Sequence, residues 1–336
     1  MLSHFKSHCG SVRIELKKTT AQSAILGAIV ADAAALGLHW LYDQERIQEI
    51  SPVTPEFLTP NAANYVNTMG YFAHEGKVSG DISQYGEQVL VMLKSLALNG
   101  GRYDKTHYQT LFSEFFGYGG EYVGYIDHAT RETLNNIARF KKESASGFLG
   151  ADDKQHPAMA KLPALVVCYA GSPELHNVIV SAIKVTNNNS QAISFGCAAA
   201  KVIETAILTR DPEQSVWAAH GVSDKDVSRL LDDAMSRRSE SCVDVTTHFG
   251  LACDLSFGVP TALHNIATSA SYSEAIRQNI LAGGDSCGRA ILVGSVLGAC
   301  YGIGGEKGIP PQWVERLTKI ESVQALLAEI EVLNEA

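Results

Sequence analysis

Apolar and polar residues recur along this chain mainly at helical spacing. Over residues 87–98, Val89 and Leu93 fall on one face and Lys94 on the other, and Asn-Gly-Gly follows at 99–101. This repeat, closed by a pair of glycines, predicts a helix. The same kind of pattern predicts further helices over residues 127–140, 174–185, 190–208, 224–237, 273–281, 290–301, 311–320 and 322–333.

Residues 21–41 are almost entirely small and apolar, which predicts a helix that is buried on most sides and ends near Gly37. Asp32 and His39 interrupt this apolar segment. An ionisable group in such surroundings must be paired or neutral. Asp32 is therefore either a structural acid that hydrogen-bonds a loop or an active-site carboxylate, and the pattern leaves both open.

The chain shows no alternation typical of strands, no linker and no internal repeat. We therefore expect one compact all-α domain over residues 21–336, preceded by an N-terminal extension over residues 1–20. A long polar loop is expected over residues 51–81. If this loop closes over a site as a lid, His74 and Asp81 become candidate site residues.

Composition narrows the class of protein. Apolar residues make up 46% and charged residues 19% of the chain, which is typical of a globular protein and excludes a disordered one. Because 36 acidic residues exceed 27 Lys and Arg, the net charge is −9, the wrong sign for binding nucleic acid through its phosphates. Apolar runs such as residues 164–170 are much shorter than the ~20 residues of a membrane span, so we expect no membrane segment.

The seven cysteines are scattered, and no two form a Cys-x-x-Cys pair. This pattern predicts free thiols and excludes both a disulfide framework and a structural zinc site. Residues 1–18 also lack an apolar core of signal-peptide length. We therefore expect a cytoplasmic protein.

The segment 283–290 (GGDSCGRA) is the strongest candidate for chemistry. Two glycines allow unusual backbone angles, and the helix that follows offers free N–H groups and a positive dipole end to an anion. Asp285 at the helix entrance is either a metal or phosphate-site residue or simply an N-cap. Cys287 beside Arg289 is either a thiol of lowered pKa or a small packing residue.

The segment 80–88 (GDISQYGEQ) leads into the helix predicted at 87–98 in a similar way. Asp81, Ser83 and Glu87 offer oxygen donors at the junction of loop and helix, as a hard cation such as magnesium requires. Ser83 followed by Glu87 is also close to a capping pattern, so helix initiation is the alternative.

Taken together, these segments resemble the ADP-ribosylglycohydrolase family. Residues 27–37 (GAIVADAAALG) are similar to the family's opening helix, and residues 283–290 match its Gly-Gly-Asp-Ser/Thr turn. A small-residue helix and an Ile-Pro-x-x-Trp element at 309–313 follow in the expected order. The resemblance covers about residues 21–320. It implies a compact all-α fold, a binuclear magnesium site and hydrolysis of N- or O-glycosidic ADP-ribosyl bonds.

The chain departs from the family at the metal site. Where the family has Thr/Ser-Asp-Asp-Thr, this chain has Gln84-Tyr85-Gly86-Glu87, and Cys287-Gly288 replaces the Asp-Thr that ends the second motif. Two close cations need several anionic ligands. One magnesium ion or none is therefore expected rather than two. The remaining metal ligands are Asp285, Ser286 and Glu87.

The motifs Ser-x-Tyr-Gly-Glu-Gln at 83–88 and Gly-Gly-Asp-Ser-Cys-x-Arg-Ala at 283–290 are similar to the J-crystallin branch of the family, the crystallins of jellyfish lenses. We therefore expect a divergent or inactive hydrolase that retains an ADP-ribose-type pocket. The alternatives are an active magnesium-dependent hydrolase of a small-molecule or ADP-ribosylated substrate, and a structural lens protein. The candidate catalytic residues are Asp285 and Glu87, and the candidate ligand-binding residues are Asp32, Tyr85, Gly86, Gly283, Gly284, Ser286, Cys287 and Arg289.

Overall fold

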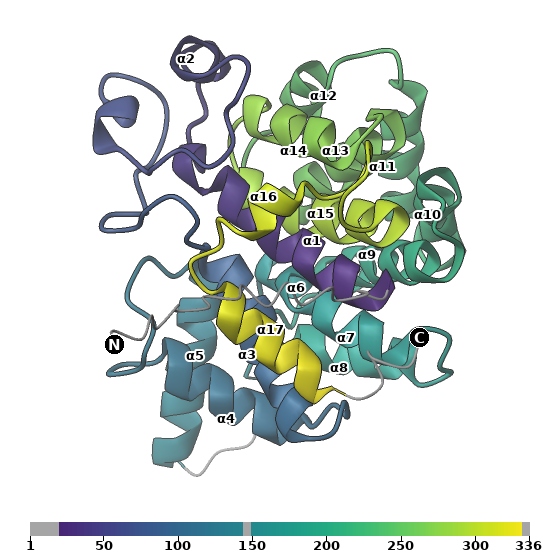
Figure 1. Cartoon of the computed structure of the whole chain (residues 1–336). Helices are drawn as coiled ribbons and strands as arrows, with labels where there is room; N and C mark the ends of the chain where they lie inside the picture. The colour runs from purple at the N-terminus through teal and green to yellow at the C-terminus, as the bar shows by residue number, and fades with distance from the viewer. Residues whose placement is uncertain (1–19, 144–148, 331–336) are drawn as a thin grey trace, which may run out of the picture.

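A computed structural model describes residues 20–143 and 149–330 of the chain (Figure 1). Over these residues the fold is helical, and β-structure is limited to four isolated bridges. The predicted all-α class is therefore confirmed. Apart from Thr20, the predicted N-terminal extension lies outside the described residues. The helices are α1 (Thr20–Ala35), α2 (Gln44–Ile50), α3 (Gln84–Leu98), α4 (Lys105–Phe116), α5 (His128–Glu143), α6 (Pro157–Ala160), α7 (Leu162–Tyr169), α8 (Leu175–Thr186), α9 (Ser190–Thr209), α10 (Pro212–Ala218), α11 (Lys225–Ser236), α12 (Cys242–Phe249), α13 (Leu255–Thr268), α14 (Tyr272–Leu281), α15 (Ser286–Tyr301), α16 (Pro311–Val314) and α17 (Ile320–Glu329), with the 3-10 turns η1 (Leu36–Leu38), η2 (Ala62–Tyr65) and η3 (Ala219–Gly221).

The pair α1 and α15 forms the centre of the fold (Figure 1). All but the first residue of α1 and all but the last residue of α15 are buried. Glycines allow the two backbones to approach: a Cβ atom added to Gly27 would lie 2.1 Å from the carbonyl oxygen of Gly294, and one added to Gly298 would lie 2.4 Å from that of Ser23. The small residues of the sequence therefore serve close helix packing.

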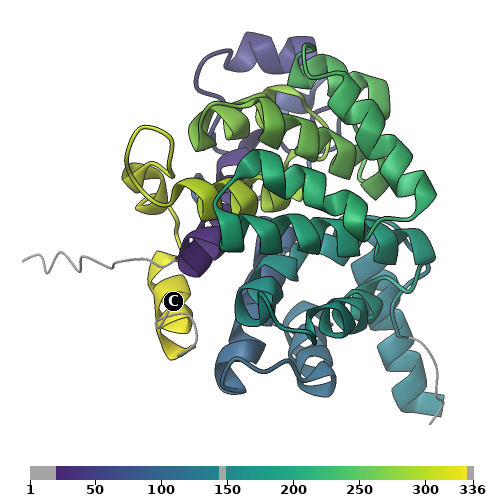
Figure 2. The same cartoon turned by 90° about the vertical axis from the view of Figure 1, so that its right-hand side faces the viewer.

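The other helices surround this pair. Figure 2 shows the green helices between residues 212 and 281 grouped at one end of the molecule together with α2, and the blue-teal helices α3 to α5 at the other end. The buried apolar side chains of both groups form one continuous cluster. The entrances of α3 and α15 meet near this centre, together with the short helix α6.

Two of the predicted helices are long and apolar. Thr20–Leu38 and Ser190–Thr209 could cross a membrane by length and composition alone, which the short uninterrupted apolar runs of the sequence did not reveal. The expectation of no membrane segment stays a prediction. The first of these helices lies wholly inside the fold, where α1 packs against α15. A helix at the centre of a large core is apolar on every side, and this accounts for its composition.

Several predicted helices have different ends. α3 begins about one turn earlier than predicted because Ser83 caps it, its hydroxyl accepting a hydrogen bond from Tyr85 N–H at 3.0 Å. The helix predicted over 311–320 ends at Val314. Residues 331–333 of the last predicted helix lie outside the described residues. The pattern did not predict α4, α12 or α13, and α13 carries Pro260 in its interior, where proline normally marks a helix end.

Candidate functional site

Asp285 is fully buried at the start of α15. The two preceding glycines have φ angles of +72° and +65°, and a Cβ atom on Gly284 would lie 2.1 Å from the carbonyl oxygen of Leu251. This backbone aims the Asp285 carboxylate back at its own helix, where Oδ1 accepts a hydrogen bond from Gly288 N–H at 3.0 Å. Asp285 is thus the N-cap of α15, one of the two roles that the sequence left open, and Gly283 and Gly284 shape the turn that carries it.

Three further side chains converge on the Asp285 carboxylate. The Tyr85 hydroxyl donates a hydrogen bond to Oδ2 at 3.1 Å. Burial raises the pKa of Tyr85, so the phenol stays protonated. His156 Nδ1 lies 2.8 Å from Oδ2, and His39 Nε2 lies 3.7 Å from Oδ1. Burial alone would raise the pKa of Asp285, but the two imidazoles and the Gly288 N–H hold it below its ordinary value. Asp285 is therefore a carboxylate in a shell of polar groups, namely a hydroxyl, a backbone N–H and two imidazoles.

His39 is neutral and has a defined tautomer. Its Nδ1 accepts a hydrogen bond from Cys287 N–H at 3.0 Å, so the ring proton is on Nε2, the nitrogen that faces Asp285. Burial lowers the pKa of His39 to about 4. The sequence analysis noted His39 as an interruption of the apolar helix and did not place it in the site.

His156 lies between α13 and α15, and each of these helices has a glycine where it contacts the imidazole ring. A Cβ atom on Gly258 of α13 would lie 2.4 Å from Nε2, and one on Gly288 of α15 would lie 2.5 Å from Cγ. The 2.8 Å approach of Nδ1 to Asp285 Oδ2 is not aligned as a hydrogen bond, and neither ring nitrogen has a hydrogen-bond partner within the described residues. Sequence reasoning missed His156 as a site residue, since nothing local connects it to position 285.

Loop 51–81 brings a third histidine to the cluster. The His74 ring is 5% exposed, its centroid lies 5.1 Å from that of His39, and both ring nitrogens lack a partner in the described part of the chain. Burial keeps the pKa of His74 well below its usual range. Asp81, the other candidate in this loop, instead accepts hydrogen bonds from Val78 N–H and the Thr318 hydroxyl. Of the two lid candidates, only His74 reaches the neighbourhood of Asp285.

Aromatic rings border this cluster next to His39. Trp40 has a φ of +62°, an unusual value for a bulky residue, and its ring centroid lies 4.6 Å from that of His39. Tyr125 and Tyr71 pack against Trp40 with centroids 4.8 and 6.0 Å away. The backbone of Trp40 is fixed on both sides, because its N–H donates to Gly284 and its carbonyl accepts from Tyr71. Trp40 therefore links loop 51–81 to the turn before Asp285.

Asp32 connects α1 to the entrance of α3. It is fully buried, and its two oxygens accept hydrogen bonds from the Ser83 N–H at 2.6 Å and the Ser83 hydroxyl at 2.5 Å. Gly86 permits this approach, since a Cβ atom there would lie 2.5 Å from Asp32 Oδ2. The geometry favours the structural role that the sequence analysis left open for Asp32.

The Asp32 carboxyl makes the stability of the fold depend on pH. Burial, opposed by the Ser83 hydrogen bonds, raises its pKa from 3.8 to about 7. Between these values the folded protein holds a proton that the unfolded chain has released, so this contribution to stability falls as the pH rises. In Asp32→Asn we expect this pH dependence of the unfolding free energy to disappear. The unfolding free energy of the wild type relative to the variant should drop by roughly 2 kcal/mol between about pH 5 and about pH 7.5 in urea titrations.

The matched control for this measurement is Asp226→Asn, since Asp226 is exposed in the first turn of α11. Its unfolding free energy relative to the wild type should show no comparable change over the same pH range. A constant difference between the wild type and Asp32→Asn would contradict the buried proton.

Glu87 is not directed at Asp285. Glu87 and Tyr85 are two residues apart in the first turn of α3, and side chains at that spacing point about 200° apart around a helix. Tyr85 contacts Asp285, whereas the Glu87 Oε1 atom pairs with Lys319 Nζ at 2.5 Å. The structure therefore separates the two candidate catalytic carboxylates in orientation, and Lys319 was not anticipated.

Cys287 and Arg289 have structural surroundings. Cys287 is fully buried with its thiol 3.5 Å from the carbonyl oxygen of Asp32, and burial holds its pKa well above the ordinary value, so a thiol of lowered pKa is wrong. The buried Arg289 guanidinium donates to the Asn279 side chain at 2.8 Å and to the carbonyl oxygens of Asn279 and Gly283. It is thereby committed to the turn and not free to bind a ligand anion.

A second set of buried polar groups lies beside the first. Asp127 caps α5 through Thr130 N–H at 2.7 Å, but its other oxygen has no partner within the described ranges, and burial raises its pKa to about 7. Lys161 is fully buried, donates to the Thr186 hydroxyl, and has its pKa lowered by burial to about 7. Asp127 counteracts that lowering. Lys161 carried no signal in the sequence, because a lysine between helical segments is normally exposed.

The Ser286 hydroxyl is buried and has no partner within the described part of the chain. Among residues 20–143 and 149–330, no group of three or more His, Cys, Asp or Glu side chains is placed to hold a metal ion.

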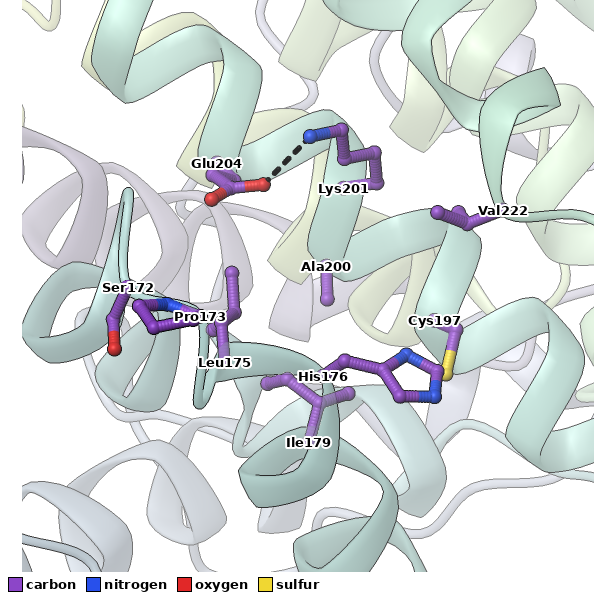
Figure 3. A pocket seen from close by; sticks show the side chains of 10 residues that line it. All are labelled: Ser172, Pro173, Leu175, His176, Ile179, Cys197, Ala200, Lys201, Glu204 and Val222. Atoms are coloured by element: carbon purple, nitrogen blue, oxygen red, sulfur yellow. Dashed lines mark hydrogen bonds and ion pairs between the residues drawn. The ribbon is translucent and has the colours of Figure 1, made fainter.

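A separate pocket of about 240 Å³ lies between α8 and α9, away from Asp285 (Figure 3). Leu175, Ile179 and Ala200 form its apolar part, and the ion pair between Lys201 and Glu204, 2.9 Å long, stands at one side. None of the side chains that gather around Asp285 lines this pocket.

Comparison with known proteins agrees with this architecture. The model of the ADP-ribosylglycohydrolase family matches residues 15–336. Crystallin J1A of Tripedalia cystophora is 30% identical over 315 residues, which cover 90% of this chain and 93% of the relative. Crystallin J1B of the same organism is 28% identical over 329 residues, covering 94% and 97%.

The fold also matches a solved structure. The "ADP-ribosylglycohydrolase-related protein complex" superposes with a TM-score of 0.67 at 18% identity, covering 94% of this chain and 98% of the solved one. At that identity the match concerns the fold alone. The sequence matches to the family and to its relatives also cover nearly the whole chain. The chain therefore belongs to the ADP-ribosylglycohydrolase family, in its J-crystallin-like branch.

Proposed function

We propose that this protein is a divergent family member that keeps a pocket for an ADP-ribose-type ligand around Asp285 and does not use two-metal hydrolysis. The observation that supports the pocket is a concentration of buried polar atoms without partners among the described residues. They include both ring nitrogens of His74 and of His156 and the hydroxyl of Ser286. An unpaired buried polar group costs about 1–3 kcal/mol. A ligand rich in hydroxyls, such as a ribose, can donate to and accept from these groups.

The residues around Asp285 do not fit a pair of magnesium ions. Magnesium requires octahedral oxygen ligands, usually with one or two carboxylates per ion. The Asp285 oxygens already accept hydrogen bonds from Tyr85 O–H and Gly288 N–H, and His39 turns its protonated Nε2 toward Oδ1. His156 Nδ1 lies 2.8 Å from Oδ2 on the remaining side. Glu87 is paired with Lys319. The proposed function therefore includes no step through a metal.

A ligand reaches Asp285 only if the surrounding structure opens. Asp285, His39 and His156 are each at most 1% exposed. Loop 51–81 has little regular structure beyond η2, and it places His74 beside His39. In the proposed function this loop moves to admit the ligand, and His74 contacts the ligand when the loop closes.

Calorimetric titration with ADP-ribose, in EDTA and then in excess magnesium, tests the proposal. We expect binding in both buffers with dissociation constants that agree within about threefold. AMP and ribose 5-phosphate serve as the matched fragment ligands. Chromatography of an ADP-ribosylated peptide after incubation with the protein should show no released ADP-ribose.

Other outcomes point to the alternatives. Binding that needs magnesium, together with release of ADP-ribose, would identify an active magnesium-dependent hydrolase. No heat in either buffer would leave no support for a retained pocket. A structural role then becomes the better explanation, and the similarity to two proteins called crystallins favours it as the second candidate. Such a role predicts that the protein is among the most abundant soluble proteins of its tissue.

A further inference from the structure

A lysine pairs with Glu87, the buried carboxylate at the entrance of α3. The Nζ atom of Lys319 lies 2.5 Å from Oε1 of Glu87, whose side chain is 4% exposed, while the lysine side chain is 43% exposed. Lys319 therefore reaches inward from the surface and places its ammonium group against a carboxylate that is otherwise shielded from water. A carboxylate so buried needs a partner of opposite charge.

The backbone holds Lys319 in this position. The preceding residue, Thr318, donates its N–H to the Gly80 carbonyl at 3.1 Å and its hydroxyl to Asp81 at 2.7 Å. A Cβ atom on Gly80 would lie 2.0 Å from the carbonyl oxygen of Arg316, so the two segments are in close contact. The segment between α16 and α17 is thus fastened to the loop that leads into α3. The fold therefore fixes the backbone next to Lys319 at a place from which its ammonium group reaches Glu87.

The cavity beside this pair holds further charges. Lys77 and Lys319 line a cavity of about 300 Å³ together with the carboxylates of Asp81, Glu87 and Glu121. Asp81 accepts hydrogen bonds from Val78 N–H and the Thr318 hydroxyl, whereas Glu87 pairs with Lys319. A divalent cation at Glu87 would have to displace the Lys319 ammonium group, and a nearby ammonium group repels a cation.

We propose that the ammonium group of Lys319 takes, at Glu87, the place that a bound divalent cation would otherwise occupy, so that the protein neutralises Glu87 with its own side chain. Lys319 is then the residue that decides whether the entrance of α3 binds a metal ion. This inference rests on the proposed function, because a metal-free entrance of α3 agrees with a ligand pocket around Asp285 that requires no magnesium.

The test is Lys319→Met in the full chain, stripped with EDTA and titrated with Mn²⁺ while free Mn²⁺ is followed by electron paramagnetic resonance. We expect the variant to bind one Mn²⁺ at least about tenfold more tightly than the wild type. The double variant Lys319→Met/Glu87→Gln should lose this gain. The matched control is Lys307→Met, which removes the same charge at an exposed lysine beside Tyr301 and should bind Mn²⁺ as the wild type does.

Three results would overturn the proposal. They are Mn²⁺ affinity in Lys319→Met no higher than in the wild type, an equal gain in Lys307→Met, and a gain that survives Glu87→Gln. Where Lys319→Met fails to fold, Lys319→Gln keeps a hydrogen-bond donor for Glu87 without the charge, and the same outcomes apply. Because the probe is the metal alone, these results do not depend on whether ADP-ribose binds. Failure of the proposed ligand pocket and failure of this inference are thereby distinguished.

Discussion

Gly294→Ala should lower the free energy of unfolding by about 3 kcal/mol or more, because the added methyl group has no space between α1 and α15. Its Cβ atom would lie 2.3 Å from the carbonyl oxygen of Gly27 and 2.5 Å from the Cβ atom of Ala31. Backbone cannot turn aside as a flexible side chain can. The Gly27 carbonyl is also held, since it accepts a hydrogen bond from the buried Tyr272 hydroxyl at 2.6 Å. Urea unfolding followed by circular dichroism measures the loss.

The matched control is Gly221→Ala in η3, where an added Cβ atom meets nothing within 4 Å and the backbone angle is ordinary. Its unfolding free energy should stay within about 0.5 kcal/mol of the wild type. Equal midpoints for the two variants would show that α1 and α15 can separate at little cost, and the packing argument would fail.

The helices were predictable where apolar residues recur at helical spacing throughout a segment. α9 and α11 show clear helical patterns, and their predicted limits of 190–208 and 224–237 lie within one residue of the observed ones. The burial of α1 was predictable, since its small and apolar residues leave no polar face. α13 was missed because Pro260 interrupts its pattern, and the tertiary contacts of a buried helix outweigh the hydrogen bond that proline lacks.

The candidate site was predictable only at its local centre. Asp285 stands in a glycine turn before a helix, and that motif is contiguous in the sequence. Its partners His39, His74 and His156 come from the turn after η1, a long loop and the residue before α6. No spacing rule connects such segments. The signal that remained was indirect: His39 interrupts an apolar segment, where an imidazole needs a partner.

Charged residues were the least predictable part of the site. Arg289 and Glu87 were assigned to ligand and metal because their charges stand at helix entrances. Burial changes that interpretation, because a charged group removed from water needs a partner inside the protein. Arg289 finds carbonyl groups of the turn, and Glu87 finds Lys319, a residue far away along the chain. Lys161 shows the same effect for a residue that carried no local motif at all.

Asp285→Ala should lower the unfolding free energy by about 3–5 kcal/mol and weaken ADP-ribose binding at least tenfold. The change leaves Gly288 N–H, Tyr85 O–H and the His156 ring without their carboxylate in an interior that water does not reach.

The control separates this loss from that of an ordinary helix cap. Asp254 also caps a helix, accepting from Ser256 N–H at 2.8 Å, but it pairs with Lys154 nearer the surface. Asp254→Ala should therefore cost only about 1 kcal/mol and leave ADP-ribose affinity unchanged. Calorimetry and urea unfolding on both variants decide the matter. Equal losses of stability would mean that Asp285 is a cap and nothing more. Loss of stability with unchanged affinity would place the ligand elsewhere, because a ligand that satisfies His74, His156 and Ser286 must lie against the Asp285 shell.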